Sequence, residues 1–168
     1  MMKQMTEANL KAAFAGESQA HMKYANFAER AEKEGQPNVA RLFHAAAFSE
    51  RIHANSHLRA LSGIEDTSAN LSAAIAGETF EVEEMYPAYT AVAEAQGESK
   101  ALRSMNWALK AEVVHAALYT QAHKAVSEGK DLGAIDFWVC TACGFTMEGE
   151  PPDVCPVCGA KHDKFREF

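Results

Sequence analysis

The chain repeats apolar residues with the spacing of an α-helix over most of its length. Leu10, Phe14 and Tyr24, for example, fall three or seven positions from Glu17 and would form one stripe along a helix. Stop signals are widely spaced, because glycine commonly ends a helix and proline does not continue one. They stand at Gly35-Gln36-Pro37, Ser62-Gly63, Gly97 and Gly129. The pattern therefore predicts four helices, at about residues 6–34, 38–61, 67–97 and 98–128.

These predicted helices are long and their connections are short. A helix of roughly 25–30 residues has a length of about 40 Å. Four such helices joined by short loops suggest an up-down helical bundle. Pro87 lies inside the third helix, where it should kink the helix or interrupt its hydrogen bonds locally, because proline has no backbone N–H.

The character of the chain changes near residue 130. Residues 131–136 read as a short linker, and residues 137–168 carry Cys, Gly and Pro at close intervals. A tail of about 30 residues buries too little surface to fold alone, so a bound metal would have to supply folding free energy. We therefore expect a helical domain over residues 1–130, a linker over 131–136 and a small metal-bound domain over 137–168.

Composition and charge argue against several classes of protein. The 168 residues are 48% hydrophobic and 23% charged, as in ordinary globular proteins. Sixteen Lys and Arg against 23 Asp and Glu give a net charge of −7, which argues against a nucleic-acid-binding protein. No apolar run reaches the length of a membrane helix, and the first ten residues do not read as a signal peptide. We therefore expect a cytoplasmic protein.

The two halves of the helical region repeat each other. Residues 9–17 (NLKAAFAGE) match residues 70–78 (NLSAAIAGE), and residues 50–54 (ERIHA) match residues 112–116 (EVVHA). Each half thus reads as a helical hairpin with one Glu on its first helix and a Glu-x-x-His pair on its second. Two such hairpins packed about a pseudo-twofold axis would bring these acids and histidines together.

The glutamates of this repeat lie in the middle of apolar stripes. Glu17, Glu50, Glu78 and Glu112 are each flanked at helical spacing mainly by apolar residues, without a nearby Lys or Arg on the stripe. A buried carboxylate without a partner costs several kcal/mol, so a cation is needed. Carboxylates and neutral histidines suit iron or manganese. The alternative is that these acids fall inward on ordinary amphipathic helices.

The arrangement of these residue types indicates a particular kind of metal site. One Glu from each of two helices and a Glu-x-x-His pair from each of the other two are typical of ferritin-like di-iron carboxylate bundles. The two pairs would be Glu50 with His53 and Glu112 with His115. We therefore expect these four residues, with a Glu from each first helix, to hold two iron ions.

Glu81 departs from the repeat. It follows Glu78 by three residues and so lies on the same helix face, whereas the equivalent position in the first half is Ala20. Two ferric ions carry more positive charge than two ferrous ions and favour a further anionic ligand. Glu81 could bind mainly in the oxidised state; the alternative is that it only forms a hydrogen bond beside the site.

The tail contains a second candidate metal site. Cys140 and Cys143 form one C-x-x-C pair and Cys155 and Cys158 another. Each pair is followed by a glycine, which permits the tight turn that aims backbone N–H groups at the sulfurs. Four thiolates in a tetrahedron bind zinc or iron. The adjacent candidate redox site favours iron, with a structural zinc site as the alternative.

Together these motifs resemble the rubrerythrin family over nearly the whole chain. The resemblance rests on residues 15–20 (AGESQA), on the two Glu-x-x-His pairs, on residues 77–87 (GETFEVEEMYP) and on the cysteine tail. The tail is similar to a rubredoxin domain with a shortened insert. The resemblance implies an all-α, four-helix ferritin-like bundle followed by a small rubredoxin-like domain.

The resemblance also implies a function. Rubrerythrins are cytoplasmic di-iron peroxidases that reduce hydrogen peroxide to water. Electrons would enter through one iron at the four cysteines and would come from NAD(P)H by way of separate reductases or rubredoxin. Homodimers are usual in the family, with no nucleic-acid or membrane partner expected.

By the family pattern, the second half of the repeat would supply most of one iron's ligands. Glu50 and Glu112 would bridge the two irons. Glu78 and His115 would complete the ligands of one iron. Each of these four residues is therefore a candidate catalytic residue as well as a candidate ligand.

The other iron would change its ligands with oxidation state. Glu17 would bind it in both states, and it would exchange His53 for Glu81 on oxidation. Tyr24 and Tyr86 would form hydrogen bonds to ligand carboxylates. Two alternatives to the peroxidase remain at this point: a ferroxidase or oxygen-reducing di-iron protein, and a non-catalytic helical scaffold with a structural zinc tail.

Overall fold

The computed structural model describes residues 2–168 and divides the chain into two compact units. The first unit ends at Glu65 and the second begins at Asp66. Helices lie within one residue or two of the predicted bounds, apart from an interruption in the third. No helix among residues 2–168 combines the length and the apolar character needed to cross a membrane.

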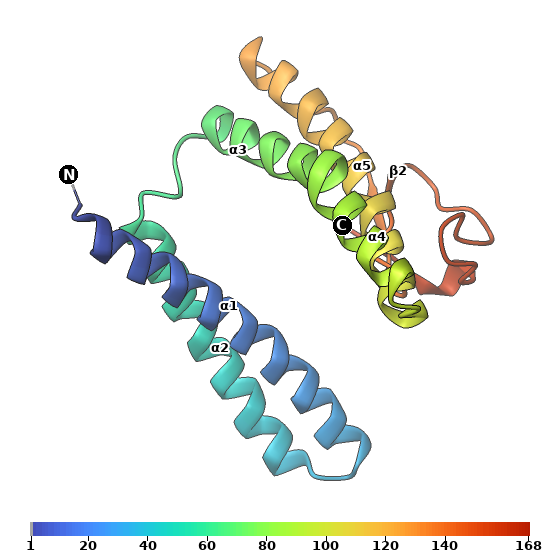
Figure 1. The fold of residues 1–168 in the computed structure, drawn as a ribbon. Coiled ribbons are helices and arrows are strands. Elements are labelled where there is room, and N and C mark those ends of the chain that lie inside the picture. Colours follow the sequence, from blue (N-terminus) through green and yellow to red (C-terminus); the bar gives the residue numbers. More distant parts are fainter. Residues whose placement is uncertain (1) are drawn as a thin grey trace. The chain divides into compact units, whose positions relative to one another are not determined.

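The first unit is a hairpin of two antiparallel helices, α1 (Gln4–Lys33) and α2 (Pro37–Ala60), which lie side by side in Figure 1. The turn between them is tight because Gly35 adopts a left-handed conformation, with φ of 74°. The N–H of Gln36 then bonds the carbonyl of Ala31, and Pro37 starts the next helix.

The helical part of the second unit is also an antiparallel hairpin. Its first arm consists of α3 (Thr67–Phe80), the π-helical turn η1 (Glu81–Met85) and α4 (Tyr86–Ala95), and its second arm is α5 (Ser99–Ser127). The π turn ends just before Pro87, which cannot donate a backbone hydrogen bond. The expected local break in hydrogen bonding is therefore a wide turn inside a continuous arm.

The last part of the second unit is a small three-stranded antiparallel sheet. Its strands are β1 (Phe137–Cys140), β2 (Thr146–Glu148) and β3 (Phe165–Glu167), with a 3₁₀ turn η2 (His162–Lys164), and their order is β2-β1-β3. Its small core is built from Cys140, Cys155 and Phe165, with Trp138 packed against it. The cysteines are thus part of the core as well as candidate ligands.

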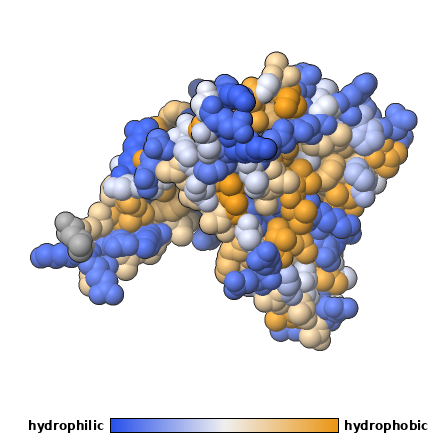
Figure 2. All heavy atoms as spheres, turned by 90° about the horizontal axis from the view of Figure 1, so that it is seen from above, coloured by the Kyte–Doolittle hydropathy of each residue, from blue (hydrophilic) through white to orange (hydrophobic). Residues whose placement is uncertain are grey.

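The two helical hairpins have cores of alanine. In the described helices, the buried apolar residues are Ala28, Ala31, Ala40, Ala47, Ala54, Ala93, Ala111 and Ala122. Alanine lets neighbouring helices approach closely but buries little apolar area. Larger apolar side chains are exposed to solvent on both units, among them Phe48 and Ile52 on α2 and Phe80 and Val113 on the second hairpin. Figure 2 shows apolar patches on the surface of the molecule.

Candidate metal centres

The first unit brings together three of the predicted ligands. Glu17 comes from α1, and Glu50 and His53 lie one turn apart on the same face of α2. His53 Nδ1 lies 3.0 Å from Glu50 Oε2 and 4.0 Å from Glu17 Oε1. We call these three residues the first trio.

The second unit repeats this arrangement on its own hairpin. Glu78 comes from α3, and Glu112 and His115 come from α5. His115 Nδ1 lies 2.6 Å from Glu112 Oε2 and 4.0 Å from Glu78 Oε1. These three residues form the second trio. The repeat seen in the sequence is therefore a repeat of side-chain geometry.

The donor atoms of both trios fit a bound iron ion. Within each trio, one atom from each residue lies within 4.8 Å of the others. Bonds of about 2.1 Å from one ion to oxygen or imidazole nitrogen place adjacent donors about 3 Å apart and opposite donors about 4 Å apart. Each trio supplies two carboxylates and one histidine, and no Lys or Arg among residues 2–168 forms a salt bridge with any of the six.

The proton affinities differ between the trios. Burial raises the pKa of Glu78 to about 7, and the neighbouring carboxyl of Glu112 contributes to the rise while His115 opposes the shift. Hydrogen bonds with Glu17 and with His53 lower the pKa of Glu50. The second trio therefore carries a carboxyl whose charge is unfavourable until a cation is present.

Glu81 lies close to the second trio without joining it. It starts the π turn, one turn after Glu78. Burial raises its pKa, and the negative charge of Glu112 raises it further while His115 lowers it. The charges of the second trio therefore change the pKa of Glu81. Its backbone lies in a π turn, whose hydrogen bonds are spaced differently from those of an α-helix. Its role as a ligand stays a prediction.

The two predicted tyrosines have different surroundings. Burial raises the pKa of Tyr86, and the charges of Glu81, Glu112 and Glu78 raise it further, so Tyr86 lies near the acids it is predicted to contact. The ring of Tyr24 packs near the rings of Phe27 and Phe43, with centroids 6.2 Å away in each case.

The four cysteines of the tail form a compact cluster. Sγ of Cys140 lies 3.7 Å from Sγ of Cys158, and the sulfurs of Cys143 and Cys155 are also 3.7 Å apart. A tetrahedron with metal–sulfur bonds of about 2.3 Å has edges of about 3.8 Å, so the cluster has the size of a metal site. The distances are too long for disulfides, and all four residues are free.

Backbone amides surround these sulfurs as predicted. Gly144 and Gly159 both have positive φ, 83° and 76°, so each turn folds back over its C-x-x-C pair. Burial raises the pKa of Cys143 and of Cys158, although an N–H group from the chain just beyond each one opposes the shift. Burial also opposes ionisation of Cys155, but backbone N–H groups outweigh it and its pKa is lowered. A bound cation would complete the stabilisation of the thiolates.

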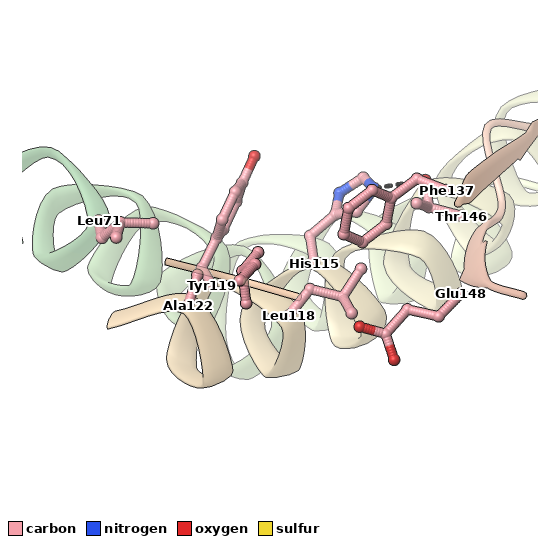
Figure 3. A pocket seen from close by; sticks show the side chains of 9 residues that line it. Leu71, His115, Leu118, Tyr119, Ala122, Phe137, Thr146 and Glu148 are labelled. Atoms are coloured by element: carbon pink, nitrogen blue, oxygen red, sulfur yellow. Dashed lines mark hydrogen bonds between the residues drawn. The ribbon is translucent and has the colours of Figure 1, made fainter. Parts of the chain in front are cut away.

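The structure reveals one contact that the sequence does not indicate. His115 Nε2 lies 2.8 Å from the hydroxyl of Thr146 on β2, which in turn donates to the carbonyl of Gly144 at 3.2 Å. Figure 3 shows the His115 ring beside Phe137 and Thr146. The two residues are 31 positions apart, and no sequence motif around Thr146 predicts the contact.

A cavity of about 360 Å³ opens beside this contact. It is mainly apolar and lies between α5, the start of α3 and the strands of the tail (Figure 3). Its lining residues are Leu71, His115, Leu118, Tyr119, Ala122, Leu132, Phe137, Thr146 and Glu148. A predicted iron ligand, His115, therefore forms part of the cavity wall.

Comparison with known families agrees with these sites. The family model described as Rubrerythrin matches residues 8–123, which include both trios, and the model described as Rubrerythrin, rubredoxin-like domain matches residues 138–166, which include all four cysteines. The chain belongs to the rubrerythrin family.

Individual relatives cover almost the whole chain. Rubrerythrin-2 of Clostridium acetobutylicum is 40% identical over an alignment of 178 positions, gaps included, which covers 98% of this chain and 97% of that protein. Nigerythrin of Nitratidesulfovibrio vulgaris is 34% identical over 95% of this chain and 85% of its own. A solved structure of nigerythrin in a mixed-valence state covers 100% of this chain and 88% of that chain, with a TM-score of 0.56 and 34% identity.

Family membership confirms several predictions made from the sequence. The fold is a ferritin-like helical domain with a small rubredoxin-like domain. The Glu/His trios and the four-cysteine site agree with the predicted iron cofactors. This rubrerythrin-family chain is an oxidoreductase and a di-iron protein of oxidative-stress defence. The predicted domain boundaries and the roles of individual ligands stay predictions.

Proposed function

We propose that this protein is a cytoplasmic non-haem peroxidase that reduces hydrogen peroxide to water, with electrons relayed through iron at the four cysteines. The observation that carries the proposal is the pair of matching trios, one of which is hydrogen-bonded to a strand of the cysteine domain. Family membership supports an iron-dependent oxidoreductase, and the proposal adds the substrate and the route of the electrons.

The ligands are assigned by their place in the two trios. Glu50 and Glu112 would bridge the irons, and Glu78 with His115 would complete one iron's ligands. Glu17 and His53 would hold the other iron in the reduced state.

Oxidation would change one ligand. Glu81 would replace His53, because ferric ions favour additional negative charge. Two observations support this assignment: Glu81 lies on a π turn, a feature common at functional sites, and its pKa responds to Glu112 and His115. Its partner in the exchange, His53, is 53% exposed on its hairpin and so has room to move.

The chemistry follows from the stoichiometry of peroxide reduction. Hydrogen peroxide takes up two electrons and two protons and gives two molecules of water. Two ferrous ions held side by side would supply one electron each, so that the O–O bond is cleaved without release of a radical. Apolar side chains beside the ligands, such as Phe14 on α1, Ile75 on α3 and Leu109 on α5, would restrict the access of other reactants.

Electrons would reach the second trio across the contact between β2 and α5. The Thr146 hydroxyl donates to the carbonyl of Gly144 and accepts the N–H of His115 Nε2, and the N–H of Gly144 bonds the carbonyl of Cys140. A short hydrogen-bonded path therefore joins a cysteine of the tail to a ligand of the bundle. NAD(P)H, through separate reductases or rubredoxin, would re-reduce the cysteine-bound iron, and the protein would act as a homodimer or a higher homo-oligomer.

A single-turnover assay tests the proposal. The anaerobically reduced protein is mixed with limiting peroxide, and the remaining peroxide is measured over time. We expect rapid loss of peroxide with the parent chain and at least a tenfold slower loss with Glu50→Ala, since removal of a predicted bridging ligand disrupts the pair of irons. Glu29→Ala is the matched control, because Glu29 is 64% exposed and lies outside both trios.

The outcomes separate the alternatives. Equal rates for Glu50→Ala and the parent chain would contradict the proposal, as would a parent chain that reacts faster with oxygen than with peroxide. Loss of activity in Glu29→Ala would show that the assay reports a general disturbance of the helices.

A further inference from the structure

One arm of the second hairpin holds a residue more than the matching segment of the first. The two halves match with an offset of 61 residues up to the first ligand, as in Glu17 and Glu78. Further along they match with an offset of 62 residues, as in Tyr24 and Tyr86. The second half therefore holds one extra residue between Glu78 and Tyr86.

The π turn takes up this extra residue. Helix α1 runs through the matching segment as a regular α-helix, whereas in η1 the N–H of Tyr86 bonds the carbonyl of Glu81, five residues earlier. A π turn holds one residue more than an α turn, so the helix beyond it returns to the position that it has in the first hairpin. Ala31 and Ala93, which are 62 residues apart, are accordingly both 5% exposed.

The wide turn also keeps the predicted site residues of this arm on one face. Seven residues of α-helix end about 20° short of two full turns, whereas eight end about 80° beyond them. Tyr86 follows Glu78 by eight residues, so a plain α-helix would turn it away from the second trio. In the structure, burial raises the pKa of Tyr86, and the charges of Glu81, Glu112 and Glu78 raise it further. The wide turn thus holds Tyr86 beside the acids.

Two residues whose counterparts in the first half are alanines fix the end of the π turn. A further step of the wide turn towards the C-terminus would need an N–H from Pro87, which has none. The hydroxyl of Thr90 donates to the carbonyls of Tyr86 and Pro87, at 2.8 and 3.1 Å. The matching residues of the first half are Ala25 and Ala28. The wide turn can therefore move only towards the N-terminus of the arm.

We propose that the π turn is a hinge that moves the Glu81 carboxylate into and out of the iron ligand set. In this structure the wide turn follows Glu81, whose place around the helix axis therefore continues from Glu78. A wide turn ahead of Glu81 makes its place continue from Tyr86 instead, and the side chain rotates by about 100°, the rotation of one helical residue. Pro87 is a positioning residue, because it blocks movement of the turn in the other direction.

The charge of the irons selects between the two arrangements. With the wide turn behind it, Glu81 lies among the carboxylates of the second trio, and the charges of Glu81, Glu78 and Glu112 act on one another. Three carboxylates are favourable beside two ferric ions and less favourable beside two ferrous ions. We therefore expect Glu81 to turn in on oxidation and out on reduction. The inference rests on the ligand exchange of the proposed function and adds the part of the backbone that performs it.

Amide hydrogen exchange tests the hinge without any substitution. The iron-loaded parent chain is compared, without air, in its reduced and oxidised states. Movement of the wide turn breaks and remakes the hydrogen bonds of residues 79–86, so we expect their exchange rates to differ by at least about fivefold between the states. The regular helix over residues 18–24 is the internal control and should change less than about twofold. Equal exchange of residues 79–86 in both states would overturn the inference.

A shortened arm tests the hinge through iron binding. Deletion of Glu84 together with Pro87→Ala gives this arm the spacing of the first half and leaves every predicted ligand in place. A continuous α-helix then holds Glu81 on the face of Glu78 in both oxidation states. We expect the ratio of ferric to ferrous affinity to rise at least about tenfold, because the additional carboxylate no longer leaves the reduced site. The matched control is Glu84→Ala with Pro87→Ala, which loses the same two side chains and keeps the extra residue.

The results distinguish this inference from the proposed function. A shortened chain that binds iron with the affinity ratio of its control would overturn the hinge and leave the peroxidase proposal intact. If the shortened chain does not fold, the exchange measurement on the parent chain decides. Exchange that depends on oxidation state, in a parent chain that does not reduce peroxide, would uphold the hinge and contradict the proposed function.

Discussion

The ring of His115 is held from both sides, with Glu112 at 2.6 Å from Nδ1 and Thr146 at 2.8 Å from Nε2. The Thr146 hydroxyl donates to the carbonyl of Gly144 and is thereby left to accept the N–H of Nε2. When a metal ion binds at Nδ1, among the carboxylates of the second trio, this hydrogen bond would keep the N–H on Nε2 and leave the lone pair of Nδ1 for the metal. A hydrogen bond of this kind fixes the tautomer and orientation of a metal-binding histidine.

Replacement of Thr146 by valine should therefore weaken iron binding at the bundle. Valine keeps the size of the side chain and removes the hydroxyl, and loss of such a supporting hydrogen bond commonly costs about 10- to 100-fold in metal affinity. Competition with a ferrous chelator measures the affinity. Thr146→Ser, which keeps the hydroxyl, should retain the affinity of the parent chain. Equal affinities for all three proteins would contradict this role of Thr146.

The metal-free protein should lose stability as the pH rises towards neutrality. The pKa of Glu78 is raised to about 7 in the folded state, from an ordinary value of 4.5, so the folded state binds the proton more tightly than the unfolded state. The free energy of unfolding therefore falls as the pH rises from about 4.5 to about 7, and remains lower above that range.

Glu78→Gln removes this titration. We expect the variant, free of metal, to be more stable than the parent at about pH 8 by an amount on the order of 1 to 3 kcal/mol, and equal to it at about pH 4. Urea unfolding at both pH values measures the difference, with exposed Glu29→Gln as the control. A variant that is less stable than the parent at the higher pH would contradict the direction of the shift.

Zinc at the cysteine site should preserve the fold of the tail and stop the relay of electrons. The Sγ–Sγ distances of 3.7 Å suit either metal, but zinc has no redox chemistry. We expect the zinc-substituted protein to react once with peroxide and then to stop, even when the reductant is in excess. Continued turnover at the rate of the iron form would show that electrons enter the bundle by another route.

Removal of the Glu81 carboxylate separates its two candidate roles. If Glu81 binds iron mainly after oxidation, Glu81→Ala should leave ferrous binding within about threefold of the parent and weaken ferric binding by more than about tenfold. Titration of both oxidation states measures this difference. Glu84→Ala on the same π turn is the control, because Glu84 is exposed. Equal losses in both states would indicate a structural role, and no loss would contradict the ligand exchange.

The parts of the site that follow from local periodicity can be predicted from the sequence. Residues three apart on one helix share a face, so the spacing alone pairs Glu50 with His53 and Glu112 with His115. The C-x-x-C pairs with their glycines likewise predict a turn whose conformation the positive φ of Gly144 confirms.

Features that depend on tertiary contacts are outside the reach of the sequence. The contact of Thr146 with His115 depends on how the tail packs on α5, and no local pattern encodes it. Pro87 predicts an interruption of the third helix, but the interruption lies ahead of the proline, as a π turn that begins at Glu81. The alanine-only cores depend on how closely the paired helices approach each other, which the spacing of apolar residues does not specify.

Both metal sites of this protein should hold iron, exchange electrons and react preferentially with peroxide. The most direct test follows the visible colour of the cysteine-bound iron, which is present in the ferric state and bleached in the ferrous state. The protein is reduced without air and then mixed with one equivalent of hydrogen peroxide or with air-saturated buffer. We predict rapid return of the colour with peroxide and slow return with air. A protein that never shows the colour, or one that regains it as fast with air as with peroxide, would contradict the account.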